Sequence, residues 1–99
     1  MTHLRLWRFE VAVDGEARFL TAYGPKGDWA RLFGRAPGFI RTELWREREG
    51  RYLTADHWES QDAFNRFQAA MGDEYRTLDK KLEGVAGIET FVGSFEFVD

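Results

Sequence analysis

Residues 52–64 constrain the fold more than any other stretch, because they predict a strand that runs directly into a helix. Side chains alternate in character from Tyr52 to Trp58, which is the period of a β-strand. Ser60 then offers a side-chain oxygen to the free N–H groups of a helix start, and Asp62 adds favourable charge. Beyond Ser60, apolar residues at spacings of three and four predict a helix of about six turns that bends near Gly72. These residues are Phe64, Phe67, Met71, Tyr75, Leu78 and Leu82.

The other segments predict three more strands and a broken first helix. Strand-like alternation and helical spacing divide them as follows: strands over residues 4–13, 39–48 and 88–98, and helical pieces over residues 16–23 and 28–33. A two-residue Glu49-Gly50 turn predicts a hairpin between the second and third strands. The order β-α-β-β-α-β is that of an α+β, ferredoxin-like domain: a four-stranded antiparallel sheet with both helices on one face. We expect one domain over residues 1–99.

Strict alternation assigns the side chains of each strand to two faces. It groups Trp7 with Phe9, Val11 and Val13, Phe39 with Arg41, Glu43 and Trp45, and Phe91 with Gly93, Phe95 and Phe97. Several strands therefore have apolar side chains on both faces, which an antiparallel sheet with one solvated face does not show. A second copy packed against the open face of the sheet would bury them. We therefore expect a homodimer through this face, in the form of a dimeric α+β barrel.

Composition excludes several classes of protein. The chain has no Cys, so disulfides and thiolate chemistry are absent, and its net charge of −3 lacks the basic stripe that nucleic acids select. Charged residues interrupt the apolar ones over residues 1–8, so we expect neither a signal peptide nor a membrane span, and a cytoplasmic location. Aromatic residues make up 16% of the chain, an excess typical of an interface or a ligand pocket.

Two short motifs resemble a known family. The strand-end Trp58-Glu59-Ser60 with Ala63-Phe64, together with Pro37-Gly38-Phe39 before the second strand, is similar to the antibiotic biosynthesis monooxygenase-like family. The first-strand aromatics and Phe95 in the last strand extend the resemblance over nearly the whole chain. It implies a small dimeric α+β barrel with a pocket between the sheet and the helices. It also implies, for some members, oxidation of polycyclic phenols by O2 without a cofactor.

The resemblance is incomplete at the positions that carry chemistry. The cofactor-free oxygenases have an Asn four residues before the strand-end Trp and a Tyr six residues after it, where this chain has Thr54 and Phe64. Haem-degrading members have a Trp nine residues after the strand-end Trp and an axial His further along the helix. This chain has Phe67 at the first position and Thr77 or Asp79 at the second. The sequence therefore predicts no haem degradation, and binding of polycyclic phenols with weak or absent oxidation.

The candidate catalytic residues are Trp58, Thr54 and Asp56, which alternate onto the strand face that the resemblance directs toward the helices. A carboxylate on that face needs a partner, and Arg8 or Arg41 is available. Two interpretations stay open: Asp56 forms an ion pair that sets the strand register, or it is a base of raised pKa. His57 points to the opposite, inter-subunit face.

The candidate substrate-binding residues are mostly aromatic, and their number predicts that they do not all pack on one another. They are Tyr23, Trp29, Phe33, Arg41, Phe64, Phe67 and Tyr75. We expect an apolar pocket for a flat aromatic molecule, with no metal and no cofactor, since the two His are at no recognisable ligand spacing. Three functions remain: a cofactor-independent monooxygenase of a phenolic or quinol-like compound, a non-catalytic small-molecule binding barrel, and a structural dimer with a filled interior.

Overall fold

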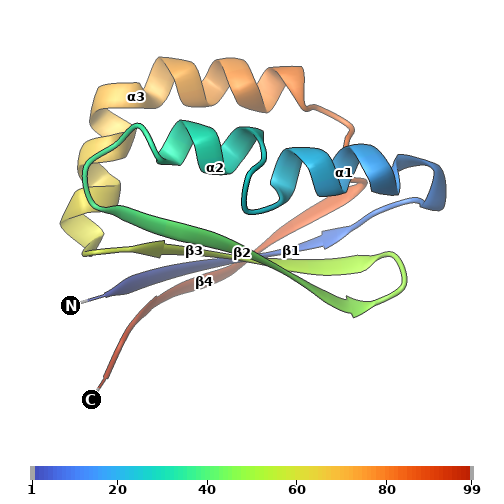
Figure 1. Ribbon diagram of the computed structural model, residues 1–99, viewed down its shortest axis with the longest axis horizontal. Coiled ribbons are helices and arrows are strands. Elements are labelled where there is room, and N and C mark those ends of the chain that lie inside the picture. The colour runs from blue at the N-terminus through green and yellow to red at the C-terminus, as the bar shows by residue number, and fades with distance from the viewer. Residues whose placement is uncertain (1, 99) are drawn as a thin grey trace.

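The computed structural model describes residues 2–98 and confirms the expected order of elements. These are β1 (His3–Glu10), a 3-10 turn (Val13–Gly15), α1 (Glu16–Tyr23), α2 (Asp28–Phe33), β2 (Phe39–Arg48), β3 (Arg51–Trp58), α3 (Gln61–Lys81) and β4 (Ile88–Glu96). All three helices lie on the same side of the sheet and leave its other face uncovered (Figure 1). The fold is therefore α+β and ferredoxin-like. Within the described part of the chain, no helix is long and apolar enough to cross a membrane.

The sheet has the order β2-β3-β1-β4, and every neighbouring pair is antiparallel. The predicted turn at Glu49-Gly50 joins β2 to β3, and Gly50 takes a positive φ of 78°. Residues directly opposite each other on antiparallel strands share a face. Four cross-strand pairs therefore form the helix-covered face of β1 and β3: Phe9–Tyr52, Trp7–Thr54, Arg5–Asp56 and His3–Trp58.

The junction between β3 and α3 has the predicted cap. Ser60 has an extended backbone, and its Oγ accepts a hydrogen bond from the Ala63 N–H at 3.1 Å. The Glu59 N–H donates to the carbonyl of Gly38 at 2.7 Å, which ties the loop before β2 to this junction. Gly38 has a φ of 92°, and a Cβ at this residue would lie 2.5 Å from the Ala63 Cβ. The Pro-Gly-Phe motif thus needs its glycine because the loop passes directly over the start of α3.

Helix α3 bends where the sequence places its central glycine. The non-helical residue is Met71, directly before Gly72, with φ −124° and ψ 25°. Phe64 and Phe67 in the first half of the helix are buried, and Met71, Tyr75 and Leu78 pack against the core with partial exposure. The bend is visible in Figure 1, where the start of α3 descends toward the end of β3. It lets one apolar stripe follow the twisted sheet over 21 residues.

Three groupings by strict alternation are wrong. A register shift between Phe39 and Arg41 places Phe39 opposite Trp58 and Arg41 opposite His57, so these two side chains lie on different faces of the sheet. A second shift on β4 places Phe91 opposite Trp7 and Phe95 opposite Leu4, which separates them in the same way. The physical reason is the β-bulge, because one extra residue inverts the alternation of everything that follows.

The third grouping fails because β1 is shorter than predicted. The strand ends at Glu10, and Val13 belongs to the 3-10 turn with 78% of its surface exposed. Val11 remains in the core. The alternation therefore describes only the part of the segment that pairs with β3 and β4.

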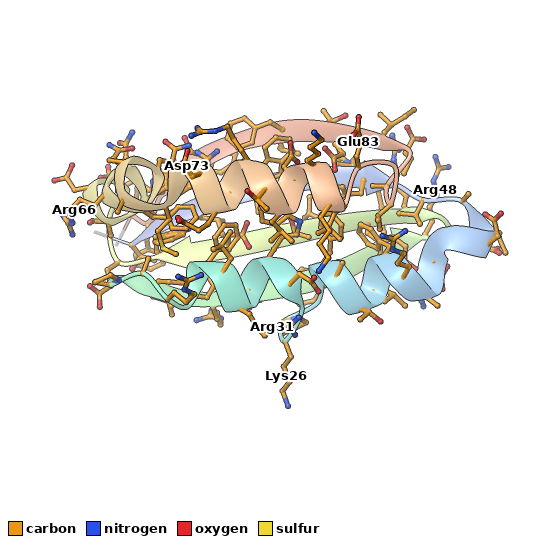
Figure 2. The ribbon with its side chains drawn as sticks, turned by 90° about the horizontal axis from the view of Figure 1, so that it is seen from above. Lys26, Arg31, Arg48, Arg66, Asp73 and Glu83 are labelled. Atoms are coloured by element: carbon orange, nitrogen blue, oxygen red, sulfur yellow. The ribbon has the colours of Figure 1, made fainter. Side chains whose placement is uncertain are left out.

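The core lies between the sheet and the helices and is dominated by rings. Its largest fully buried side chains are Phe19, Tyr52, Trp58 and Phe67. Seen from above the helices, side chains fill the space between α3 and the α1–α2 pair, while charged residues such as Lys26, Arg66 and Asp73 project outward (Figure 2). This aromatic layer determines how much space remains for a ligand.

Candidate functional site

A narrow cavity of about 50 Å³ lies between the helices and the covered face of the sheet. All four strands and all three helices contribute residues to it. Its lining residues are Trp7, Phe9, Tyr23, Trp29, Phe33, Thr42, Thr54, Asp56, Tyr75, Asp79 and Glu89. Pockets for drug-sized ligands have volumes of roughly 300–1,000 Å³, much larger than this cavity. The aromatic residues therefore pack on one another far more completely than the sequence predicts. The cavity is also more polar than expected.

Asp56 is the buried carboxyl group of this cavity. Only 8% of the surface of Asp56 is exposed, and its Oδ1 accepts a hydrogen bond from the Thr42 hydroxyl at 2.7 Å. Burial raises the pKa of Asp56 to about 6, while the Thr42 hydrogen bond and the positive charge of Arg5 oppose that rise. A carboxyl group with this pKa exchanges its proton close to neutral pH.

The partners predicted for Asp56 are wrong. Arg8 forms an ion pair with Glu47 at 3.3 Å, and Arg41 forms one with Glu43 at 3.3 Å. Both arginines lie on the uncovered face, because Arg8 is opposite Leu53 and Arg41 is opposite His57. The neighbours of Asp56 are instead its two cross-strand partners, Thr42 on β2 and Arg5 on β1. Among residues 2–98, Asp56 is held by the Thr42 hydrogen bond and forms no ion pair within 4 Å.

A second polar cluster lies at Tyr23. Its hydroxyl donates a hydrogen bond to Glu89 Oε1 at 3.1 Å, joining α1 to β4. Burial, and next the negative charge of Glu89, raise the pKa of Tyr23. Burial, and next Asp79, raise the pKa of Tyr75. The buried indole Nε1 of Trp29 has no hydrogen-bond partner within residues 2–98. The cavity thus combines a titratable carboxyl group with hydroxyl and N–H donors.

Comparisons with known proteins decide the family. A family model described as "Antibiotic biosynthesis monooxygenase" matches residues 6–80. The chain belongs to the antibiotic biosynthesis monooxygenase family. A search of curated protein sequences finds no match.

Solved structures of this family have the same fold. The N63A mutant of SnoaB, a cofactor-independent oxygenase from Streptomyces nogalater, is 26% identical with a TM-score of 0.72, covering 99% of this chain and 94% of that chain. The heme-degrader MhuD from Mycobacterium tuberculosis, with two hemes bound, is 25% identical with a TM-score of 0.65, covering 97% and 95%. The monooxygenase ActVA-Orf6 of Streptomyces coelicolor, in complex with nanaomycin D, is 18% identical with a TM-score of 0.70, covering 98% and 88%, and supports the fold alone.

Six of the site residues predicted from the sequence line the cavity. They are Tyr23, Trp29, Phe33, Thr54, Asp56 and Tyr75. Five lining residues were missed in the sequence: Trp7, Phe9, Thr42, Asp79 and Glu89. Thr42 was not detectable, because the turn at Glu49-Gly50 pairs Arg48 with Arg51, a register that would place Thr42 opposite His57. The register shift between Arg46 and Arg48 moves Thr42 opposite Asp56. Glu89 was not detectable either, because it lies 66 residues from its partner Tyr23 in the sequence.

The other four predicted residues do not line the cavity. Trp58 has no exposed surface and packs with Phe64 and Phe67 at ring-centroid distances of 5.5 and 5.4 Å. Trp58 also contacts Phe33 edge-on at 5.7 Å, and Phe33 does line the cavity. Arg41 is on the uncovered face, beyond reach of the cavity. Trp58 therefore supports the cavity wall from behind.

His57 faces the uncovered side of the sheet, as predicted. Its Nε2 lies 2.9 Å from Glu43 Oε1, and this hydrogen bond is the main cause of the lowered pKa of Glu43. His3 is buried on the helix-covered face next to Phe64, outside the cavity lining. The two histidines therefore lie on opposite faces of the sheet.

These residues do not fit haem. Phe67, Thr77 and Asp79 supply no imidazole ligand, and neither histidine lines the cavity. A volume of about 50 Å³ is also far below that of a haem site. Within residues 2–98, no group of three or more His, Cys, Asp or Glu side chains is placed to hold a metal ion.

A larger hollow of about 570 Å³ adjoins the cavity. It lies between the end of α3, residues 82–87 and the start of β4, and it shares Asp79 and Glu89 with the cavity lining. These two carboxylates therefore stand where the two spaces meet. The hollow offers a flat molecule larger than the cavity additional space on this side of the two carboxylates.

Proposed function

We propose that this protein is a cofactor-independent monooxygenase that acts on a flat phenolic or quinol-like molecule, with Asp56 as the base. One observation carries the proposal: a buried carboxyl group with a pKa of about 6 faces the cavity and is held by Thr42. A base of this pKa is matched to proton transfer near neutral pH. The family and the similarity to SnoaB, a cofactor-independent oxygenase, support the same chemistry.

The reaction needs a proton acceptor and a donor near the developing anion. Asp56 takes the proton of the phenol or of its keto tautomer, which leaves a carbanion-like anion stabilised by the Thr54 hydroxyl. This anion passes one electron to O2, and the radical pair combines to a peroxide anion. The peroxide anion takes the proton back from Asp56 and becomes a hydroperoxide. Loss of water from the hydroperoxide leaves a new carbonyl group, so one oxygen atom enters the product and the other leaves as water. Asp56 thus acts as the base in place of the Asn and Tyr of the cofactor-free oxygenases, whose positions Thr54 and Phe64 occupy in this chain.

Substrate entry requires side chains to move, because the cavity is smaller than any polycyclic ring system. We propose that the body of the substrate occupies the adjoining hollow and that its reactive ring displaces the side chains at Asp79 and Glu89. Trp58 acts indirectly in this scheme, by holding Phe33 in the wall.

The proposed assembly is a homodimer through the uncovered sheet face. Register places Trp45 opposite Leu53 and Phe95 opposite Leu4, so all four side chains lie on this face. Trp45 is 58% exposed and Phe95 is 46% exposed in the single chain. Large exposed apolar patches of this kind mark interfaces between subunits.

The small cavity volume favours a second candidate, a structural or purely binding dimer without turnover. Oxygen uptake with anthrone-like compounds distinguishes the two. We expect wild-type uptake to rise with pH through an apparent pKa of about 6, and Asp56→Asn to reduce it to the uncatalysed rate. The control is Glu49→Gln, an exposed residue of the β2–β3 turn that lines neither the cavity nor the hollow, and it should keep full activity.

Ligand binding is measured separately by tryptophan fluorescence. Trp7 and Trp29 line the cavity, so a bound flat ring should quench them, and Trp29→Phe should weaken the signal. Trp45→Phe, on the uncovered face, should not. Quenching without oxygen uptake would support a binding protein, and neither signal would support a filled structural dimer.

A further inference from the structure

Arg5 is an arginine without a polar partner beside the proposed site. Six other arginines each form an ion pair with a carboxylate: Arg8, Arg31, Arg41, Arg46, Arg51 and Arg76. The Arg5 guanidinium instead lies 3.9 Å from the ring centroid of Phe64 and 4.6 Å from that of Phe91. Within residues 2–98 it makes no hydrogen bond and no ion pair. Its N–H donors are therefore available.

The position of Arg5 follows from the strand register. Phe9 and Trp7 line the cavity, and Arg5 is the next residue of β1 on the same face. It stands directly opposite Asp56, the proposed base. Burial lowers the pKa of Arg5, and the nearby Tyr75 and Asp56 oppose this, so both of these cavity residues lie within its electrostatic reach. Arg5 thus lies on the helix-covered face of β1, one position beyond the strand residues that line the cavity.

The two rings hold Arg5 in a way that suits recognition of an anion. Cation–π contacts use the flat faces of the guanidinium, which leaves the donors around its edge free. A planar guanidinium binds a carboxylate through two parallel hydrogen bonds, and no existing ion pair must be broken first. The positive charge also offsets the repulsion between a bound carboxylate and an ionised Asp56.

We propose that Arg5 binds a carboxylate substituent of the substrate, so that the substrate class is a flat hydroxyaromatic acid whose phenolic group is directed to Asp56. This inference deepens the proposed function and rests on it for the role of Asp56. Arg5 is a specificity-determining residue in this scheme. It selects the substrate and orients its ring, and it takes no proton.

The test compares two ligands that differ only in charge, hydroxynaphthoate and its amide, by quenching of tryptophan fluorescence. We expect wild type to bind the acid roughly 10- to 100-fold more tightly than the amide, the range for a hydrogen-bonded charge pair. Arg5→Gln should abolish this preference. Arg8→Gln is the matched control, since Arg8 is on the same strand but on the opposite face, and it should keep the preference.

Thermal melting of each variant checks that folding is intact, and Arg5→Lys gives a second variant that keeps the charge. We expect Arg5→Lys to retain only part of the preference, because an ammonium lacks the planar fork. Equal binding of acid and amide by wild type, or an unchanged preference in Arg5→Gln, would overturn the inference.

The assay separates this inference from the proposed function. Oxygen uptake that depends on Asp56 without any preference for the acid would leave the function standing and remove the role of Arg5. A preference that is lost in Arg5→Gln, in a protein that takes up no oxygen, would establish the anion site and refute the monooxygenase.

Discussion

Replacing Asp56 by Asn should stabilise the protein at high pH. An ordinary Asp has a pKa of 3.8, and burial raises that of Asp56 to about 6. The folded state therefore holds this proton more tightly than the unfolded chain does. Protonation stabilises the folded protein fully below about pH 4, and this contribution is lost as the pH rises through 6. At pH 8 the buried carboxylate costs about 3 kcal/mol, since each tenfold change in an equilibrium is about 1.4 kcal/mol.

Asn removes the charge and keeps a carbonyl oxygen for the Thr42 hydroxyl, which now donates to Asp56 at 2.7 Å. The free energy of unfolding at pH 8 should therefore rise by up to about 3 kcal/mol in Asp56→Asn. At pH 4.5 most of the wild-type carboxyl groups are already protonated, and the gain should shrink to about 1 kcal/mol.

Urea denaturation at a fixed protein concentration measures both values, with Glu83→Gln as the exposed control, expected within about 0.5 kcal/mol of wild type. The same Asp56→Asn protein should lose oxygen uptake, so that stability and activity change in opposite directions. A variant that is less stable than wild type at pH 8 would refute the reasoning. It would mean that Arg5 and Thr42 stabilise the carboxylate by more than burial destabilises it.

Three further predictions concern the assembly, the chemistry and the β3–α3 junction. Light scattering at low micromolar concentration should give twice 11.6 kDa for wild type and a smaller mass for Leu53→Lys, whereas a wild-type monomer would contradict the dimer. Haem with a reductant should show no enzyme-dependent loss of the Soret band, and its loss would show that another residue binds iron. Ser60→Ala should cost about 1 kcal/mol in urea denaturation and Ser60→Asp much less, whereas equal stabilities would exclude a role for the cap.

The sequence alone determined the order of the elements and the helix-facing row of β3. Periodicity and capping are local properties, so the strand from Tyr52 to Trp58 and the cap at Ser60 follow from neighbouring residues. Tyr52, Thr54, Asp56 and Trp58 are all buried on one face of β3, as their alternation predicts, and the family resemblance directs that face toward the helices. The family resemblance also follows from this local motif.

Tertiary structure decided which of these residues form the site. The register shifts at Phe39 and on β4 inverted the predicted faces, because a bulge depends on pairing between strands that are distant in the sequence. Arg5 became the neighbour of Asp56 through the pairing of β1 with β3, and Glu89 reached Tyr23 only through β4. Trp58 was correctly placed on its strand but packed behind the cavity wall, since burial depends on every ring around it. Alternation specifies a face, whereas the space left on that face depends on how the whole core packs.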